Sequence, residues 1–350
     1  MLVDTPDAIP HRILNHFGAN ARDLPWRNPP GTPLPLDDPD WPYRVWLSEI
    51  MLQQTTVAAV RPYFAAFTSR WPSVGALAAA RDEDVMSAWA GLGYYARARN
   101  LLACARTIAL DHDGIFPSQE DALLKLPGIG RYTAAAIASI AFGNRAVVVD
   151  GNVERVVARL FAEPDKAKIY GLAQSLTPTH QAGDFAQAMM DLGATVCTPR
   201  NPRCEICPVN RDCRGRNAHQ AFPAKASKAI RPERTGIAWW VTCDDQVFLV
   251  TRPPKGLLGG MRALPSSVWS ENPDLTPPFA GEWGRYGIVR HVFTHFSLQL
   301  VVMAIAVNND CKLPLVGEWW PVGRIDEAGL PSVFAKAAQL ARATEDMREY

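Results

Sequence analysis

Residues 126–155 read LPGIGRYTAAAIASIAFGNRAVVVDGNVER, and this stretch gives the first indication of the fold. Gly128 and Gly130 permit a tight, partly left-handed turn between two helices, which we expect at 118–125 and 131–142. The turn bares backbone N–H groups at the start of the second helix, where the helix dipole favours a phosphate oxygen. It is therefore either a generic corner between helices or a grip on a nucleic-acid backbone.

Two carboxylates are placed where chemistry is possible. Asp150 follows the apolar run 147–149 and precedes a predicted helix, which suits a helix N-cap and does not exclude a second role. Glu49 lies in the otherwise apolar helical stretch 46–52. Apolar surroundings raise the pKa of a carboxyl group, which suits a general acid. The alternative is that Glu49 is a surface residue of an amphipathic helix.

The chain changes character about two thirds of the way along. Apolar residues at three- and four-residue spacing in 45–52, 77–89 and 98–108 indicate that residues 1–215 are mainly helical. Residues 216–233 are polar and contain proline, which predicts a linker. Short β-rich runs between turn residues then predict an α+β domain at 234–350. The expected strands are 236–242, 246–252, 288–293 and 298–307, followed by a helix at 331–347.

Four of the seven cysteines are grouped as Cys-x6-Cys-x2-Cys-x5-Cys in a loop with three prolines. Four thiolates in so short a loop can hold zinc or an iron–sulfur cluster. A zinc ribbon usually has two Cys-x2-Cys pairs, and this loop has one, so the spacing favours one [4Fe–4S] cluster. The expected ligands are Cys197, Cys204, Cys207 and Cys213. The remaining cysteines lie in apolar contexts and are predicted to be core residues: Cys104, Cys243 and Cys311.

Composition restricts the function classes less than the motifs do. Apolar residues make up 48% and charged residues 20% of the 350 residues, as in globular proteins. The N-terminus lacks the pattern of a signal peptide, and no apolar run approaches the roughly 18 residues of a membrane span. We therefore expect a cytoplasmic protein, associated with the nucleoid if it binds DNA. The net charge of +1 does not indicate nucleic-acid binding, although arginines cluster near 97–106 and 200–216.

Taken together, five motifs resemble those of the helix–hairpin–helix DNA glycosylase superfamily, and within it the A/G-mismatch adenine DNA glycosylase (MutY) family. The motifs are Ser48-Glu49 with Gln53-Gln54-Thr55, Gly91-Leu92-Gly93-Tyr94-Tyr95, the 126–130 turn, Val149-Asp150-Gly151-Asn152-Val153 and the four-cysteine loop. The resemblance implies a multi-domain protein with an all-α catalytic core. It implies a six-helix module at about 29–135, a cluster module formed by 1–28 and 136–215, an active site between them, and a Nudix-like domain at 234–350.

The resemblance also implies roles for individual residues. Glu49 would protonate the flipped adenine, at N7, and then orient water, while Asp150 would stabilise the sugar C1′ electrostatically or through a transient covalent bond. Tyr132 and Asn152 would be their hydrogen-bonding partners. The adenine pocket would consist of Arg22, Leu24, Trp26 and Gln187. Contacts to the DNA would come from Gln54, Thr55, Leu92, Tyr94, Gly128 and Gly130.

One departure separates the chain from the related endonuclease III-like branch. There a lysine after the turn attacks the sugar as a Schiff-base nucleophile, and here Tyr132 stands in that place. A phenol cannot form an imine. The sequence therefore predicts base removal without strong strand cleavage.

Two alternatives to glycosylase function are a Nudix hydrolase, raised by the C-terminal part, and a redox-sensing iron–sulfur protein that binds DNA. A Nudix hydrolase needs an acidic metal-binding signature, and residues 256–270 do not contain it. A redox-sensing DNA-binding protein would need neither Glu49 nor Asp150. In the family this domain recognises oxidised guanine through Phe-Ser-His, which here is Phe293-Thr294-His295. We expect a monomer whose partner is double-stranded DNA with adenine opposite 8-oxoguanine or guanine.

Overall fold

A computed structural model describes residues 8–224, 231–253, 256–308 and 313–347. The chain divides into two compact units. The first comprises residues 1–79 and 100–227, and the second comprises residues 80–99 and 228–350. No helix in the described part of the chain is long and apolar enough to cross a membrane.

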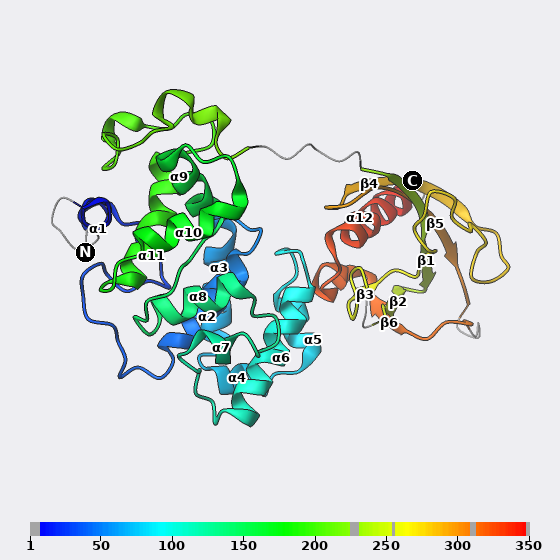
Figure 1. Cartoon of the computed structure of the whole chain (residues 1–350). Coiled ribbons are helices and arrows are strands. Elements are labelled where there is room, and N and C mark those ends of the chain that lie inside the picture. The colour runs from blue at the N-terminus through cyan, green and yellow to red at the C-terminus, as the bar shows by residue number, and fades with distance from the viewer. Residues whose placement is uncertain (1–7, 225–230, 254–255, 309–312, 348–350) are drawn as a thin grey trace. The chain divides into compact units, whose positions relative to one another are not determined.

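The first unit is built from helices, as predicted (Figure 1). Its longer helices are α1 (Ile9–Asn20), α2 (Trp41–Leu52), α3 (Val57–Arg70), α6 (Ala96–Asp111, whose first turn belongs to the second unit), α8 (Arg131–Ile140), α9 (Gly151–Phe161), α10 (Lys166–Leu176) and α11 (Ala182–Asp191). Its shorter helices are α4 (Val74–Ala78), α7 (Glu120–Leu123), the π-helix η1 (Leu192–Val196) and the 3-10 helices η2 (Cys204–Ile206) and η3 (Arg216–Ala221).

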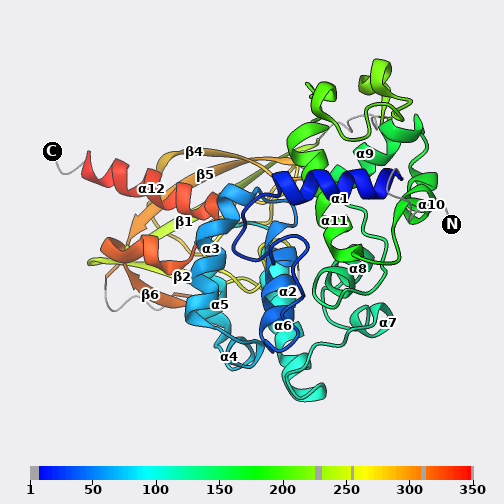
Figure 2. The same cartoon turned by 90° about the vertical axis from the view of Figure 1, so that its left-hand side faces the viewer.

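α8 is a central helix of this unit, buried from Thr133 to Ile140. It contacts both α2 and α11, and α1 lies against α11 (Figure 2). The small side chains of the sequence RYTAAAIASI let the neighbouring helices approach closely. Gly183 of α11 is so near the backbone of Ser139 that a Cβ atom there would collide with the carbonyl oxygen. The same close packing brings residues of α2, α8 and α11 to one place.

Two predicted helices differ from those observed. The stretch 77–89 is not one helix, because α4 ends at Ala78 and α5 (Asp82–Ala88), in the second unit, begins anew. Three acidic residues occupy the first turn of α5, where they are favoured by the helix dipole. The helix predicted at 118–125 is shorter, because only Glu120–Leu123 is helical.

The second unit contains a mixed β-sheet, and the predicted α+β character is confirmed. Its strands have the order β3-β2-β1-β5-β4, with β6 paired to β2. β1 and β5 are parallel, while the other pairs are antiparallel. The elements are α5, β1 (Glu233–Cys243), β2 (Gln246–Thr251), β3 (Arg262–Ala263), β4 (Gly284–Val292), β5 (Ser297–Ala306), β6 (Glu318–Pro321), the 3-10 helix η4 (Val322–Ala328) and α12 (Ser332–Asp346).

The sheet is apolar on both faces. α12 packs against β4, β5 and β1 over a core that includes Trp240, Leu300 and Phe334 (Figure 1). The other face has a separate core around Trp239 and Phe248. Two of the cysteines predicted to be core residues, Cys104 and Cys243, are buried. Cys311 lies outside the described residues.

Candidate active site

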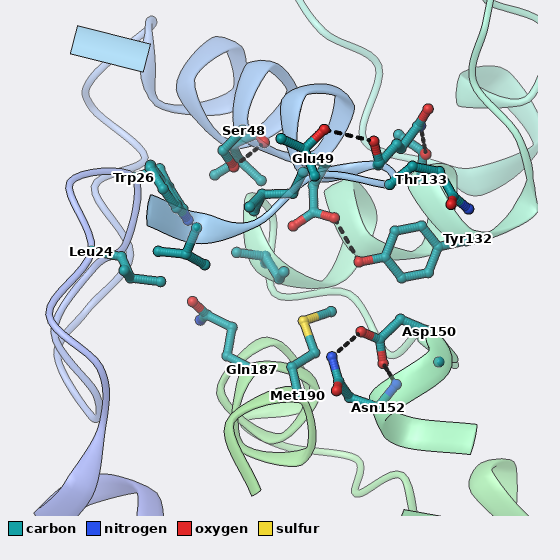
Figure 3. Close-up of a pocket in the computed structure, with 18 of the residues that line it drawn as sticks. Leu24, Trp26, Ser48, Glu49, Tyr132, Thr133, Asp150, Asn152, Gln187 and Met190 are labelled. Carbon is teal, nitrogen blue, oxygen red and sulfur yellow. Dashed lines mark hydrogen bonds between the residues drawn. The ribbon is translucent and has the colours of Figure 1, made fainter. Parts of the chain in front are cut away.

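A cavity of about 820 Å³ opens in the first unit among α2, α8, the start of α9, α11 and the segment before α2. All four predicted catalytic side chains and all four predicted pocket side chains line it (Figure 3 labels seven of these eight). They come from positions as distant in sequence as Arg22 and Gln187. The fold thus brings together residues from separate helices and from the segment between α1 and α2.

Glu49 enters the cavity from α2 and is only 7% exposed. Its Oε2 accepts a hydrogen bond of 2.7 Å from the phenolic oxygen of Tyr132 on α8 (Figure 3). Burial raises the pKa of Glu49 to about 7, and the charge of Asp150 also raises it, while the Tyr132 hydrogen bond and the charge of Arg27 lower it. The alternative of a surface glutamate is therefore excluded. A carboxyl group with this pKa can hold a proton at neutral pH and give it up.

Asp150 is the N-cap of α9, as its sequence position predicted. Its Oδ1 accepts hydrogen bonds from the backbone N–H groups of Asn152 (2.9 Å) and Val153 (2.7 Å). Its Oδ2 accepts a further bond of 2.9 Å from the side-chain amide of Asn152. The carboxyl group thus lies among three donors at the N-terminal end of α9. Asp150 is therefore fixed in orientation at the edge of the cavity.

Three of the side chains predicted to form an adenine pocket, Leu24, Trp26 and Gln187, lie away from Tyr132 on the other side of the cavity in Figure 3. Leu24 and Trp26 are 5% and 4% exposed, and the Trp26 ring packs edge-on against Phe64 at 5.1 Å. Gln187 is buried on α11. Leu24 and Trp26 give this part of the cavity an apolar surface and Gln187 gives it an amide, which suits a heterocyclic base.

The glycine turn is partly left-handed, as predicted. Gly128 has a left-handed φ of +74°, and a Cβ atom there would lie 2.6 Å from Cβ of Asn100. Gly130 does not share the left-handed conformation, since its φ is −92° and it is the extended N-cap of α8. It ends the turn and leaves the first N–H groups of α8 open. Both glycines line the cavity.

The other predicted DNA-contact residues fall into two groups. Gln54 and Thr55 line the cavity just after α2, and Gln54 has the unusual φ of +58°. Tyr94, in the second unit, has a φ of +49° and is 48% exposed. Such strained backbone persists where the surrounding structure requires it, often at binding sites. Leu92 differs from the others, because its side chain is buried.

The four grouped cysteines line one small cavity between α9 and the loop at 197–213. None of them forms a disulfide, and Arg159 donates to Sγ of Cys197 at 3.4 Å. In the described part of the chain, no three His, Cys, Asp or Glu side chains are arranged to hold a single metal ion. Four thiols on one small cavity suit a [4Fe–4S] cluster, in which each iron is held by one cysteine thiolate. Cys197, Cys204, Cys207 and Cys213 would hold it.

The cysteine loop is joined to the cavity through Arg155 of α9. Its guanidinium donates to the side-chain oxygen of Asn152 and to the carbonyl oxygen of Cys197, both at 2.8 Å. Gly193 lies so close to Asn152 that a Cβ atom there would be 2.6 Å from the Asn152 Cβ atom. The loop therefore supports the residue that orients Asp150.

Phe293, Thr294 and His295 form the turn between β4 and β5, as predicted. The Phe293 ring stacks on Phe296 at 4.8 Å and anchors the turn. Thr294 and His295 are exposed. Within the same unit, the hydroxyl of Thr294 lies 3.1 Å from that of Tyr94.

Two residues at the cavity were missed at the sequence level. Arg27 lines it, and Asp191 of α11 binds both Arg27 and Arg22. A signal for Asp191 existed, because it is an acid in the apolar run AQAMMDLGA, the same pattern that identified Glu49. Nothing in the sequence distinguishes Arg27 from other arginines.

Family models match three parts of the chain. Residues 47–178 match the HhH-GPD superfamily of base excision DNA repair proteins, residues 197–213 match the iron-sulfur binding domain of endonuclease III, and residues 237–340 match the NUDIX domain. A thermostable thymine-DNA glycosylase aligns over 59% of this chain and 94% of its own, with 30% identity and a TM-score of 0.52. The fold and the site therefore define a helix–hairpin–helix base excision repair enzyme with an iron–sulfur loop and a Nudix-like domain.

Curated relatives narrow this class. The adenine DNA glycosylase of Homo sapiens is 36% identical over 87% of this chain and 68% of its own. That of Buchnera aphidicola from Schizaphis graminum is 30% identical over 94% of this chain and 97% of its own. The enzyme of the same name from Mycolicibacterium smegmatis is 43% identical over 61% of this chain and 71% of its own. The chain belongs to the adenine DNA glycosylase family.

Proposed function

We propose that the protein removes adenine mispaired with 8-oxoguanine or guanine by hydrolysing the N-glycosidic bond, as part of base excision repair. The observation that carries this proposal is the buried Glu49–Tyr132 pair facing Asp150 across a cavity walled by Leu24 and Trp26. The cavity can accept one base that has been turned out of a duplex. Family membership adds adenine as the base.

Breaking the bond requires that the leaving purine be relieved of negative charge. Glu49, with a pKa of about 7, is protonated in part of the molecules at neutral pH and transfers its proton to the base, at N7. Tyr132 holds the carboxyl group toward the base. After departure of the base, the Glu49 carboxylate accepts a proton from the attacking water.

The sugar gains positive charge as the base leaves. Asp150 stabilises this charge at C1′, and its three hydrogen bonds keep it oriented toward the sugar. Asn152 supplies two of these bonds. Asp150 could also form a transient covalent bond to C1′. Both this bond and purely electrostatic stabilisation use the carboxylate form of Asp150.

The enzyme acts without an imine intermediate. The described residues that line the cavity include no lysine, and Tyr132 stands where the endonuclease III-like branch has its nucleophile. Water then attacks C1′ directly, or it hydrolyses a covalent adduct between Asp150 and the sugar. The product is an abasic site in an uncut strand.

We further propose a division of labour along the chain. Residues 1–215 bind the duplex and excise the base, and residues 234–350 identify the opposite base. Residues 216–233 connect these two parts of the chain. The glycine turn, Gln54, Thr55 and Tyr94 contact the DNA, the buried Leu92 supports the Tyr94 turn from within, and the 293–295 turn contacts the oxidised guanine. The enzyme acts as a monomer in the cytoplasm, at the nucleoid. A bound cluster would hold the 197–213 loop and, through Arg155, support Asn152.

The test is the release of free adenine from a duplex with one adenine opposite 8-oxoguanine. The duplex is incubated with excess protein, and the base is identified by chromatography and mass spectrometry. We expect free adenine, little from a matched A·T duplex, and strand cleavage only after alkali. An intact duplex after prolonged incubation would contradict the proposed function.

A further inference from the structure

Asp191 is a buried acid at the end of α11 that the mechanism above does not use. It is 5% exposed and is followed at once by the π-helix η1. Gln187 lies one turn earlier on the same helix and lines the cavity. π-helical turns are rare and frequently mark functional sites. The position of Asp191 therefore calls for an explanation beyond packing.

Asp191 binds two guanidinium groups at once. The backbone N–H of Arg22 donates to it at 3.0 Å and the Arg22 Nε atom at 2.7 Å. Arg27 adds a two-pronged contact with both distances at 2.8 Å. Burial raises the pKa of Asp191, but the contacts of Arg27 and Arg22 outweigh burial and lower it overall. The carboxylate is charged and fully engaged.

These contacts close a loop. Arg22 and Arg27 are the two ends of a short segment, and both are tied to the same carboxylate. Leu24 and Trp26 lie between these ends and form the cavity wall. Arg27 is also held by the Phe17 ring, 5.8 Å from the guanidinium carbon. The shape of the wall thus depends on one side chain of α11.

The same contacts hold the positive charge of Arg27 in place beside Glu49. Tyr132 faces Glu49 from α8, Asp150 faces it from the start of α9, and Arg27 faces it from the segment before α2. The α11 residues that line the cavity, Gln187 and Met190, are uncharged. Arg27 is therefore the cation whose charge lowers the pKa of Glu49, and Asp191 partly neutralises that cation.

We propose that Asp191 is a positioning residue, which closes the 22–27 segment into the wall of the base pocket and holds Arg27, half neutralised, beside Glu49. This inference rests on the proposed function. It assigns Asp191 no contact with the substrate. Its effect on the reaction passes through Arg27 and the pocket wall.

The test is the pH dependence of single-turnover adenine excision from the 8-oxoguanine duplex. Excision requires protonated Glu49, so the wild-type rate should fall as pH rises through about 7. Asp191→Asn removes a negative charge and frees Arg27 to approach Glu49. Both changes stabilise ionised Glu49, so the fall should move to lower pH by about one unit.

A second variant should act in the opposite direction. Arg27→Gln removes the cation, and the fall should move to higher pH. Asp191→Glu keeps the charge and should keep the wild-type profile. Glu163→Gln is the matched control, because it removes a carboxylate that pairs with Lys168 on the surface. Circular dichroism and absorbance near 400 nm would report folding and cluster content.

The possible results distinguish a failure of this proposal from a failure of the proposed function. A purely structural role for Asp191 would lower the rate equally at every pH, and an unmoved profile in folded Asp191→Asn would overturn the proposal. If Asp191→Asn does not fold, Arg27→Gln provides the test. A pH profile of Arg27→Gln that is unmoved, or that moves to lower pH, would also overturn the proposal. Wild-type protein that releases no adenine at any pH would instead contradict the proposed function.

Discussion

The phenolic oxygen of Tyr132 lies 2.7 Å from Oε2 of Glu49, and the Tyr132 hydroxyl donates a hydrogen bond to this oxygen at the wall of the cavity. Burial raises the pKa of both groups, and each influences the other. Tyr132 stays protonated at all ordinary pH values, so Glu49 is the member of the pair that can exchange a proton.

Replacing Tyr132 by phenylalanine should change the pH dependence of excision. The hydrogen bond stabilises ionised Glu49, so its loss should raise the pKa of Glu49 above about 7. The fall in excision rate should then move to higher pH by about one unit. Single-turnover rates of wild-type protein and Tyr132→Phe between pH 5 and 9 would measure this. A shift to lower pH would contradict the assigned role of the phenol.

The buried acid should also reduce folding stability at high pH. The folded pKa of Glu49 lies above its ordinary value of 4.5, so the folded state binds the proton more tightly than the unfolded state. Stability is therefore lost as pH rises from 4.5 to about 7, at a cost of at most about 3 kcal/mol.

The Glu49→Gln variant has no ionisable group at this position, so it should not lose this stability as pH rises. Its thermal midpoint should match that of the wild type near pH 4.5 and exceed it at pH 8.5. Glu163→Gln, at a partly exposed carboxylate on the surface, should show no such pH-dependent difference from the wild type. Equal midpoints of Glu49→Gln and wild type at pH 8.5 would mean that Glu49 is not strongly perturbed.

Borohydride should trap no covalent adduct with the DNA. Trapping requires an imine, which a phenol cannot form, and no lysine is found among the described residues of the cavity. The assay compares the protein with a lysine-dependent lyase on the same duplex, by denaturing electrophoresis. A trapped band that maps to a single lysine would restore strand cleavage as an activity.

The 293–295 turn should carry part of the preference for 8-oxoguanine. Thr294 and His295 are exposed on a turn anchored by Phe293, so their replacement should leave the fold intact. Direct readout of one base is worth about 1–3 kcal/mol. The double variant Thr294→Ala/His295→Ala should reduce the ratio of excision rates opposite 8-oxoguanine and guanine by about fivefold or more.

The control for this prediction is the rate opposite guanine. It should change little, since only contacts to the altered edge of the base are removed. Both duplexes are compared at one salt concentration, because phosphate contacts are salt-dependent. An unchanged ratio would place recognition of the opposite base elsewhere, around Gln54 and Tyr94.

Much of the fold could be predicted because its signals are local. Four of the six strands, the last helix and the N-cap at Asp150 follow from alternation, helical spacing and capping chemistry. β3 and β6 were missed, since their two and four residues carry no pattern of their own. The break between α4 and α5 was missed because helical spacing continues through it.

The site was predictable only where a residue departs from its surroundings. Glu49 and the four cysteines are conspicuous in the sequence, whereas Arg22, Leu24 and Gln187 came only through resemblance to a family. The convergence of Asp191 with Arg22 and Arg27 depends on packing between α11 and the segment before α2. Contacts of this range have no local signal.

The most direct test of the account is single-turnover excision of adenine by Glu49→Gln. The amide keeps the shape of the side chain and can accept the Tyr132 hydrogen bond, but it has no proton of suitable acidity to give. DNA affinity should therefore stay near the wild-type value, while the excision rate opposite 8-oxoguanine should fall by about 100-fold or more. Excision within a few-fold of wild type, in protein that is folded and carries its cluster, would contradict the assignment of Glu49 as the acid.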